Sequence, residues 1–423
     1  MWDKLLQIWK IKDLRNKILF VLAMLVIFRI SAHIPIPGIN AENLKELFNA
    51  NQFLGLLNIF SGGGMSNFSI IMMGIAPYIT SSIIFQLLAM IIPKLEDMMK
   101  EPTGRQKITF YTRIATVPLA ILKGYGMLAI LRNSSKVIIE DVSLFNILAI
   151  LITTTAGTIF LMWIGELITE KKIGNGISLL IFAGIVARIP TVLQEVVVNF
   201  SRDQIVNLLF FCAIAIITIV GVVFITEGQR NIPVSYAKRI RGMKMYGGMN
   251  THLPLRVNQA GVIPIIFAIS VILFPPMVAQ FMLRASSNVM QGIGQWIIDV
   301  FNNQMFYGVV YFLLVFAFTY FYTAVIFHPY QISENLQKQG AFIPGIRPGT
   351  HTAQYLQHTI SKITLTGALF FAIIAILPFV LKGSAGMQSM VIGGTSILIV
   401  VSVVIETIKQ IEAQLTMRDY EGF

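Results

Sequence analysis

The side chains that most often perform enzyme chemistry are few in this sequence and are not arranged for it. No GxxxxGK[ST] phosphate loop, HExxH motif or group of His, Cys and acidic residues at metal-ligand spacing occurs. The triplet Gly174-Asn175-Gly176 lacks a preceding strand and a third glycine, so it predicts a flexible helix start and not a nucleotide site. We therefore expect no enzyme, no cofactor and no metal site. The histidines lie in or near predicted loops without mutual helical spacing: His33, His252, His328, His351 and His358.

Isoleucine at helical spacing is the clearest regular pattern. Two sets of three isoleucines have members four residues apart, so each set lies along one stripe of a helix. Branched apolar side chains around a narrow opening exclude water and ions by dewetting. The same spacing is also typical of helices that face lipid, and spacing alone does not separate the two interpretations. The sets are Ile75, Ile79 and Ile83, and Ile177, Ile181 and Ile185.

Composition places these residues in a polytopic membrane protein. The chain has 423 residues, of which 55% are hydrophobic and 12% charged, and its mean hydropathy is +0.74. A soluble domain would not carry such a composition on its surface. The net charge of +12 is divided among short loops, which is typical of topology signals and disfavours nucleic-acid binding. The single cysteine, Cys212, allows no internal disulfide, so helix packing must stabilise the fold.

Ten apolar segments, each near the length of about 20 residues that spans a bilayer, predict ten membrane helices. Lys and Arg concentrate in alternate loops, so the positive-inside rule places both termini in the cytoplasm. We expect the first segment to be an uncleaved span, and Arg29 and Lys123 to reach a membrane surface from within their spans. The segments are residues 18–34, 74–92, 114–131, 144–165, 174–190, 205–226, 259–283, 306–327, 363–381 and 390–408.

The spans divide into five and five, which predicts an N-terminal half, residues 1–200, and a C-terminal half, residues 201–423. Because five is odd, the second half enters the membrane in the opposite direction, as inverted repeats require. Pro77 in the second span and Pro264 in the seventh occupy corresponding positions, and Pro275 and Pro276 are expected to end the seventh. Broken helices at matched positions point to a functional interface between the halves.

The uncharged stretch Phe53–Pro93 is too long for one straight span and is interrupted by a run of three glycines. We predict a short apolar segment, residues 53–60, that cannot cross the membrane, followed by a span over residues 74–92. Non-helical backbone at membrane depth survives only where it is buried in protein or lines a wet cavity. The stretch therefore implies a cavity that the short segment enters.

Nearly the whole chain resembles the SecY family, the central subunit of bacterial protein-translocation channels. The resemblance implies an all-α membrane protein with ten transmembrane helices in two inverted five-helix halves around a central hourglass pore. It also implies a channel that passes unfolded secretory polypeptides across the inner or plasma membrane and releases apolar segments sideways into lipid. The motifs are IPIPGIN (34–40), GIAPYITSSIIFQLL (74–88), KIGNGIS (172–178), YAKRIRG (236–242), THLPLRVNQAGVIPIIFA (251–268), GAFIPGIRPG (340–349) and GGTSILIVV (393–401).

Carried onto this sequence, the resemblance assigns four groups of residues. The pore ring comprises Ile75, Ile79, Ile177, Ile181, Ile266 and Ile399. The plug, a half-helix near residues 53–67, includes Leu56, Leu57, Ile59, Phe60, Gly62, Gly63 and Gly64. The lateral gate between the second and seventh spans includes Thr80, Ser82, Gln86, Asn258, Gln259 and Ser270, whose polar groups would bond weakly across the closed gate. Partner docking falls on the cytoplasmic loops 227–258 and 328–362, at Lys238, Arg239, Arg241, Lys244 and Arg347.

The implied partners are the SecE and SecG membrane subunits, the SecA motor, the ribosome, signal sequences, unfolded polypeptides and the lipid bilayer. Because the chain has no phosphate loop, the energy for movement must come from a partner. The alternative is a ten-helix secondary transporter for a small solute, which would share the inverted repeats and broken helices. A transporter would need a polar site near the membrane midplane, where this chain places isoleucines.

Overall fold

The structure is a computed structural model that describes residues 9–37, 43–44, 58, 61–132, 143–198, 205–236, 239–241, 244–246, 250–283, 285, 287–385 and 394–421. The chain forms two compact units. The first comprises Met1–Ile205, Ile269–Tyr307 and Val403–Phe423, and the second comprises Val206–Ala268 and Gly308–Ser402. The predicted halves 1–200 and 201–423 concern internal symmetry, which this division does not test, and they stay a prediction.

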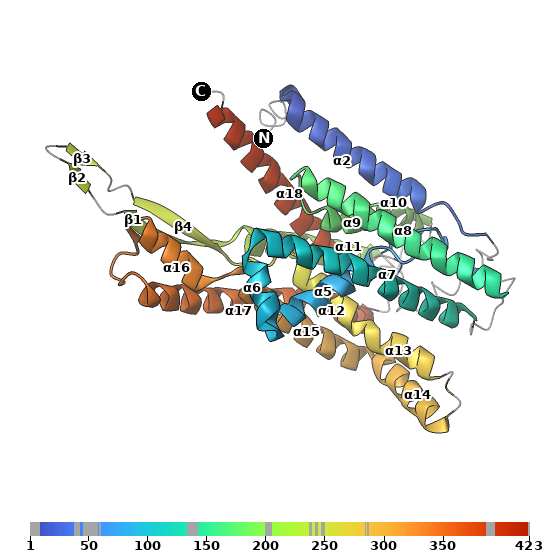
Figure 1. Ribbon diagram of the computed structural model, residues 1–423. Coiled ribbons are helices and arrows are strands. Elements are labelled where there is room, and N and C mark those ends of the chain that lie inside the picture. The colour runs from blue at the N-terminus through green and yellow to red at the C-terminus, as the bar shows by residue number, and fades with distance from the viewer. Residues whose placement is uncertain are drawn as a thin grey trace. The chain divides into compact units, whose positions relative to one another are not determined.

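Helices dominate both units (Figure 1). The helices of the first unit are α2 (Lys12–Ser31), α5 (Ala76–Ile91), α6 (Pro93–Lys100), α7 (Pro102–Arg132), α8 (Leu144–Glu170), α9 (Gly176–Val186), α10 (Ile189–Val198), α13 (Phe274–Met282) and α14 (Asn288–Asn302). The second unit contains α11 (Ile205–Glu227), α16 (Pro329–Lys338) and α17 (Thr350–Ala385). The division between units falls within α12 (Ile263–Ile272), α15 (Gln304–Ile326) and α18 (Gly394–Glu421).

Every predicted span contains a helix or a pair of helices. Within the described part of the chain, five helices are long and apolar enough to cross a membrane, and the pair α5 and α6, bent by 112°, would make a sixth. The seventh span is the pair α12 and α13. Pro275 and Pro276 lie in the first turn of α13, where a missing backbone N–H costs no helical bond, so the prediction that they end the span is wrong. Pro77 and Pro264 are likewise the second residues of α5 and α12.

The segment Ser61–Ile75, between the masked-off apolar stretch and α5, is non-helical and mostly buried. Its backbone groups find partners within the protein, as a buried segment requires. Ile70 N donates to the Ile34 carbonyl at 3.0 Å, and Ile36 N donates to the Phe68 carbonyl at 2.9 Å, which ties the segment to the chain that follows α2. Gly62 and Gly63 have φ of +66° and +84°, a conformation that side chains with a Cβ rarely adopt.

A hydrophobic core in the first unit encloses this segment. Residues of the segment pack with apolar side chains from α7 and α8, and the polar contacts between these helices are few. The Ser81 hydroxyl on α5 donates to the Thr112 carbonyl on α7 at 2.8 Å, and Arg113 on α7 pairs with Glu166 on α8 at 2.6 Å. The core comprises Ile36, Leu44, Met65, Phe68, Met72, Met73, Met127, Leu128, Leu131, Ile150 and Leu151.

The two long loops of the second unit fold together, which the sequence did not predict. Strands β1 (Gln229–Tyr236) and β4 (Asn250–Arg256) form an antiparallel pair, and β5 (Ala341–Phe342), from the other loop, adds to the free edge of β1. Strands β2 (Arg239–Arg241) and β3 (Lys244–Tyr246) form a separate hairpin between them (Figure 1). The short strands add to the helical fold class that hydropathy predicts.

A small core fixes these loops to the helices of the second unit. It joins alternate residues of β1 to side chains on α17 and around β5, so each loop covers the apolar face of the other. The core comprises Ile232, Val234, Leu255, Phe327, Ala341, Ile343, Leu356 and Ile360. Buried apolar area of this kind gives the loops a defined structure that topology signals alone do not need.

We predict that Gly157→Ala destabilises the first unit. A Cβ at Gly157 on α8 would overlap the carbonyl oxygen of Ile70, which is backbone and has little room to move. Overpacking of this kind costs about 1–3 kcal/mol, so the midpoint of thermal unfolding in detergent should fall. Gly308→Ala on α15, where no atom lies within 4 Å of the added Cβ, is the control and should leave the midpoint unchanged. Equal midpoints for the two variants would contradict the close contact.

Candidate pore and gate site

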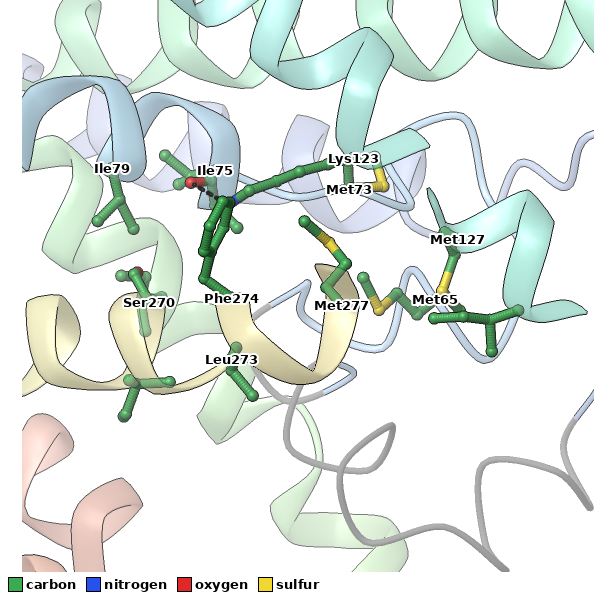
Figure 2. Close-up of a pocket in the computed structure, with 14 residues that line it drawn as sticks. Met65, Met73, Ile75, Ile79, Lys123, Met127, Ser270, Leu273, Phe274 and Met277 are labelled. Atoms are coloured by element: carbon green, nitrogen blue, oxygen red, sulfur yellow. Dashed lines mark hydrogen bonds between the residues drawn. The ribbon is translucent and has the colours of Figure 1, made fainter. Parts of the chain in front are cut away.

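A cavity of about 60 Å³ lies inside the first unit, lined by the buried segment before α5 and by α5, α7, α9, α12 and α13 (Figure 2). It is large enough for water-sized molecules, and its lining is almost wholly apolar. The lining includes three of the predicted ring isoleucines, four methionines, the predicted gate residue Ser270 and one lysine. The methionines are Met65, Met73, Met127 and Met277.

Three of the ring isoleucines, Ile75, Ile79 and Ile181, meet at this cavity with exposed fractions of 3%, 6% and 2%. Burial excludes the lipid-facing interpretation for these three within the first unit. Ile266 and Ile399, in the second unit, are also buried. Ile177 is only half-buried. That all six form one ring stays a prediction.

The N-terminal end of α5 sets the position of Ile75 and Ile79. Gly74 has φ of +56° and turns the chain into the helix, Ile75 is the N-cap residue, and Pro77 occupies the first turn, where its fixed φ suits the helix. Since Ile75 and Ile79 are four residues apart, both side chains project from one face of α5.

The triplet Gly174-Asn175-Gly176 gives α9 a fixed start, and α9 carries Ile181. Asn175 is the N-cap, and its side-chain oxygen accepts from Ile177 N at 3.1 Å and Ser178 N at 3.2 Å. The Gly174 N–H donates to Gln410 Oε1 on α18 at 2.7 Å. The helix start predicted from the sequence is therefore present, but its hydrogen bonds make it ordered and not flexible.

The polar side chains assigned to the gate bond mainly within α5 or to α7. Thr80 Oγ1 donates to the Ala76 carbonyl at 2.9 Å, and Gln86 Nε2 donates to Ser82 Oγ at 3.0 Å. Asn258 is buried, and neither atom of its amide has a hydrogen-bond partner among the described residues. Gln259 is half-buried, as is Ser270, which lines the cavity. The lateral gate stays a prediction.

The two basic residues within spans do not reach a membrane surface as expected. Lys123 on α7 is 9% exposed, lines the cavity, and donates to Thr80 Oγ1 at 2.6 Å and to the Ala76 carbonyl at 3.4 Å. Arg29 on α2 donates through Nη1 to the Gly62 carbonyl at 2.8 Å. The expectation that both charges reach a surface is wrong, because each has an acceptor inside the first unit. Sequence spacing gave no sign of either acceptor.

Of the predicted plug residues, the structure describes the glycines only. Leu56, Leu57, Ile59 and Phe60 lie outside the described residues. Gly62 and Gly64 are buried, and a Cβ on Gly62 would collide with the ring of Phe28 on α2. The glycine run is therefore held against α2 by a close contact at Phe28 and by the bond from Arg29.

Of the predicted docking residues, Arg347 is exposed on an ordered turn between β5 and α17. Thr352 Oγ1 donates to the Arg347 carbonyl at 2.9 Å, and Ser333 Oγ on α16 donates to the Gly349 carbonyl at 2.6 Å. Arg239, Arg241 and Lys244 lie on β2 and β3, where only the backbone is described, and Lys238 lies outside the described residues.

No group of three or more His, Cys, Asp or Glu side chains that could hold a metal occurs among the residues described. The sequence missed two features of the cavity, the methionine lining and Lys123. The methionines come from separate segments, so no spacing pattern connects them. The lysine was visible as a charge inside an apolar run, which is a functional signal by default in a membrane helix.

A helical membrane fold with a broken second span beside a closed apolar cavity defines a channel class of membrane protein. The model of the SecY family matches residues 69–408. The Protein translocase subunit SecY of Halalkalibacterium halodurans is 45% identical, with 100% of each chain covered. That of Mycobacterium bovis is 44% identical, with 97% of each covered. The chain belongs to the SecY family.

Solved structures show the same fold. A protein-conducting channel matches with a TM-score of 0.63 at 16% identity, covering 93% of this chain and 91% of that one. A SecY structure, whose plug domain is described as stabilising the closed state and maintaining a membrane seal, gives 0.64 at 16% identity and the same coverage. Sec61 from a canine ribosome-channel complex gives 0.61 at 16% identity, also with 93% and 91% covered. The predicted helical membrane fold is confirmed.

We predict that Asn175→Ala destabilises the start of α9. Loss of an N-cap oxygen costs about 0.5–2 kcal/mol, so the thermal unfolding midpoint in detergent should fall. Asn175→Asp keeps an oxygen at the same place and is the matched control. If Asn175→Asp fell as far as Asn175→Ala, the cap would not be the source of the stability.

Proposed function

We propose that this chain is the channel-forming subunit of a protein translocase, which passes unfolded secretory polypeptides across the inner or plasma membrane and releases apolar segments sideways into lipid. Relatives at 44–45% identity over nearly the whole chain carry the name Protein translocase subunit SecY. The observation that carries the proposal is the closed apolar cavity where Ile75, Ile79 and Ile181 meet.

An apolar constriction suits a substrate of any sequence. Branched side chains offer water and ions no hydrogen-bond partner, so a narrow opening lined by them stays closed by dewetting. The same side chains can rearrange around a passing polypeptide without selecting its sequence. We infer that Ile177, Ile266 and Ile399 complete the constriction with the three isoleucines at the cavity.

We infer that α5 and the α12–α13 pair form the lateral gate. Residues of both border the cavity, and the bonds of Thr80 and Ser82 stay within α5 or run to α7. An apolar signal sequence that enters between the two loses little by replacing such contacts and gains transfer free energy on moving into lipid.

The glycine segment suits a plug hinge. Its backbone conformation is available to glycine at Gly62 and Gly63, and the bond from Arg29 to the Gly62 carbonyl holds it against α2. We propose that the adjoining residues 53–60 close the pore in the resting state and that this contact breaks when the plug moves.

We further propose the SecE and SecG subunits, the SecA motor and the ribosome as partners, with both termini in the cytoplasm. A related channel has been described in complex with a ribosome. The ordered turn that exposes Arg347 and the folded β1–β4 hairpin give such partners a defined surface. We propose no catalytic role for the chain itself, so a partner supplies the energy.

The transporter alternative lacks support. A transporter for a small polar solute needs several polar groups converging near the midplane, whereas the cavity lining contributes one lysine and one serine. The direct test is reconstitution of the chain and its membrane subunits in proteoliposomes with the motor, ATP and a secretory precursor. Protease-protected precursor supports the proposal, and its absence with an active motor overturns it.

We predict that Ile79→Asn combined with Ile181→Asn opens the resting channel to ions. Amide side chains let water wet the cavity, so single-channel current in planar bilayers without substrate should rise, and Arg29→Gln should raise it further by loosening the glycine segment. Leu365→Asn, at an exposed position on α17, is the control for adding an amide to a membrane helix. A triple variant as tight as the native channel would remove these residues from the pore.

We predict that Arg347→Glu sharply reduces motor-driven translocation while leaving the unfolding midpoint unchanged. The side chain is exposed, so reversal of its charge affects a partner and not the fold. Lys338→Glu is the matched control, because Lys338 is 69% exposed on the same loop and pairs with Glu334. Equal losses in both variants would assign the effect to the net charge of the loop.

A further inference from the structure

Lys123 is a cation enclosed by apolar side chains. It lies on α7 and extends into the cavity, where its amine ends on the side occupied by Ile75 and Phe274 (Figure 2). Its hydrogen bonds go to Thr80 Oγ1 at 2.6 Å and the Ala76 carbonyl at 3.4 Å. Both acceptors are neutral, so the charge is solvated by dipoles alone.

Other cations of the first unit have partners of a different kind. Arg113 pairs with Glu166 at 2.6 Å, Lys17 pairs with Asp13 at 3.1 Å, and Lys171 lies over the ring of Phe20. No carboxylate lines the cavity, and Lys123 makes no ion pair with any described residue. A cation buried in a membrane protein without a counter-ion is costly to keep. Packing alone would be served better by methionine, which the cavity already uses.

The position of this charge determines what meets it. The cavity is bordered by α5 and by α12 and α13, and four methionines give it walls that can repack around an incoming side chain. A helix that enters there displaces the Thr80 hydroxyl from Lys123 or brings a side chain beside it. The ammonium then attracts a carboxylate and repels a second cation, with little water to screen either interaction.

We propose that Lys123 is a specificity-determining residue of the gate, which favours apolar signal helices carrying an acidic side chain at the matching position and rejects those carrying a basic one. This inference rests on the proposed function. Because Lys123 is one charge at one depth, the preference is confined to positions of the signal helix that share a stripe with one another, spaced three or four residues apart.

The experiment uses the reconstituted channel with its motor and a set of precursors. Each precursor carries Asp, Lys or Leu at one position of its apolar signal region, scanned over two helical turns. The rate of translocation for each is divided by the rate for the unaltered precursor in the same channel, which removes general effects of a variant on folding or gating. The channels are native, Lys123→Met, Lys123→Glu, Lys123→Arg and, as a control, Lys107→Met, an exposed lysine on the same helix.

In the native channel we expect the Asp precursors to exceed the Lys precursors at least tenfold at positions on one stripe. Lys123→Met should abolish this ratio, Lys123→Glu should invert it, and Lys123→Arg and Lys107→Met should retain it. Synthetic signal peptides provide a second readout without transport, since the Asp peptide should raise the unfolding midpoint of the native channel more than the Lys peptide does.

Each failure has a distinct form. If the native channel moves the unaltered precursor but the Asp to Lys ratio is the same with lysine or methionine at position 123, the specificity role is overturned and the channel function stands. If the unaltered precursor does not move while the motor hydrolyses ATP, the proposed function itself fails. If the ratio changes equally in Lys107→Met, the effect is one of overall charge and the inference is wrong.

Discussion

The requirement that backbone polar groups be satisfied without water governs the first unit. The second span is preceded by the non-helical segment Ser61–Ile75, which would be untenable against lipid. Pairing with residues 34–36, side-chain bonds from Ser61 and Arg29, and enclosure by α2, α7 and α8 make it stable. The close approach of Gly157 to Ile70 follows from the same need, because α8 must seal the segment at backbone distance.

Side chains around the cavity meet an opposite requirement. A pore that accepts any polypeptide must offer few specific polar contacts, so its stability comes from apolar packing and its closure from dewetting. Isoleucine supplies stiff branched walls and methionine supplies adaptable ones. The combination of Ile75, Ile79 and Ile181 with four methionines fits a site that must be tight at rest and yielding in use.

Local patterns in the sequence were enough to locate the spans, the break before the second span and the prolines in the first turns of α5 and α12. Features that depend on distant pairing were not predictable. Strand β5 is two residues long and has no pattern of its own, and it exists because β1 offers an unpaired edge. Arg29 and Lys123 were misplaced for the same reason, since their acceptors, the Gly62 carbonyl and Thr80, lie on other segments. The ring isoleucines depended on family resemblance, because spacing alone fits lipid contact equally well.

The distribution of polar bonds on α5 explains how one helix can border a gate. The Ser81 hydroxyl reaches the Thr112 carbonyl, Lys123 reaches Thr80, and Gln86 bonds to Ser82 within the helix. These bonds join α5 to α7 or to itself, whereas the side that faces the cavity presents Ile75 and Ile79. Separation on the apolar side leaves these polar groups with their partners, while separation of α5 from α7 would expose an ammonium and a carbonyl to hydrocarbon. The physical consequence is that α5 and α7 move together, and that a gate opens on the side where only dispersion contacts are lost.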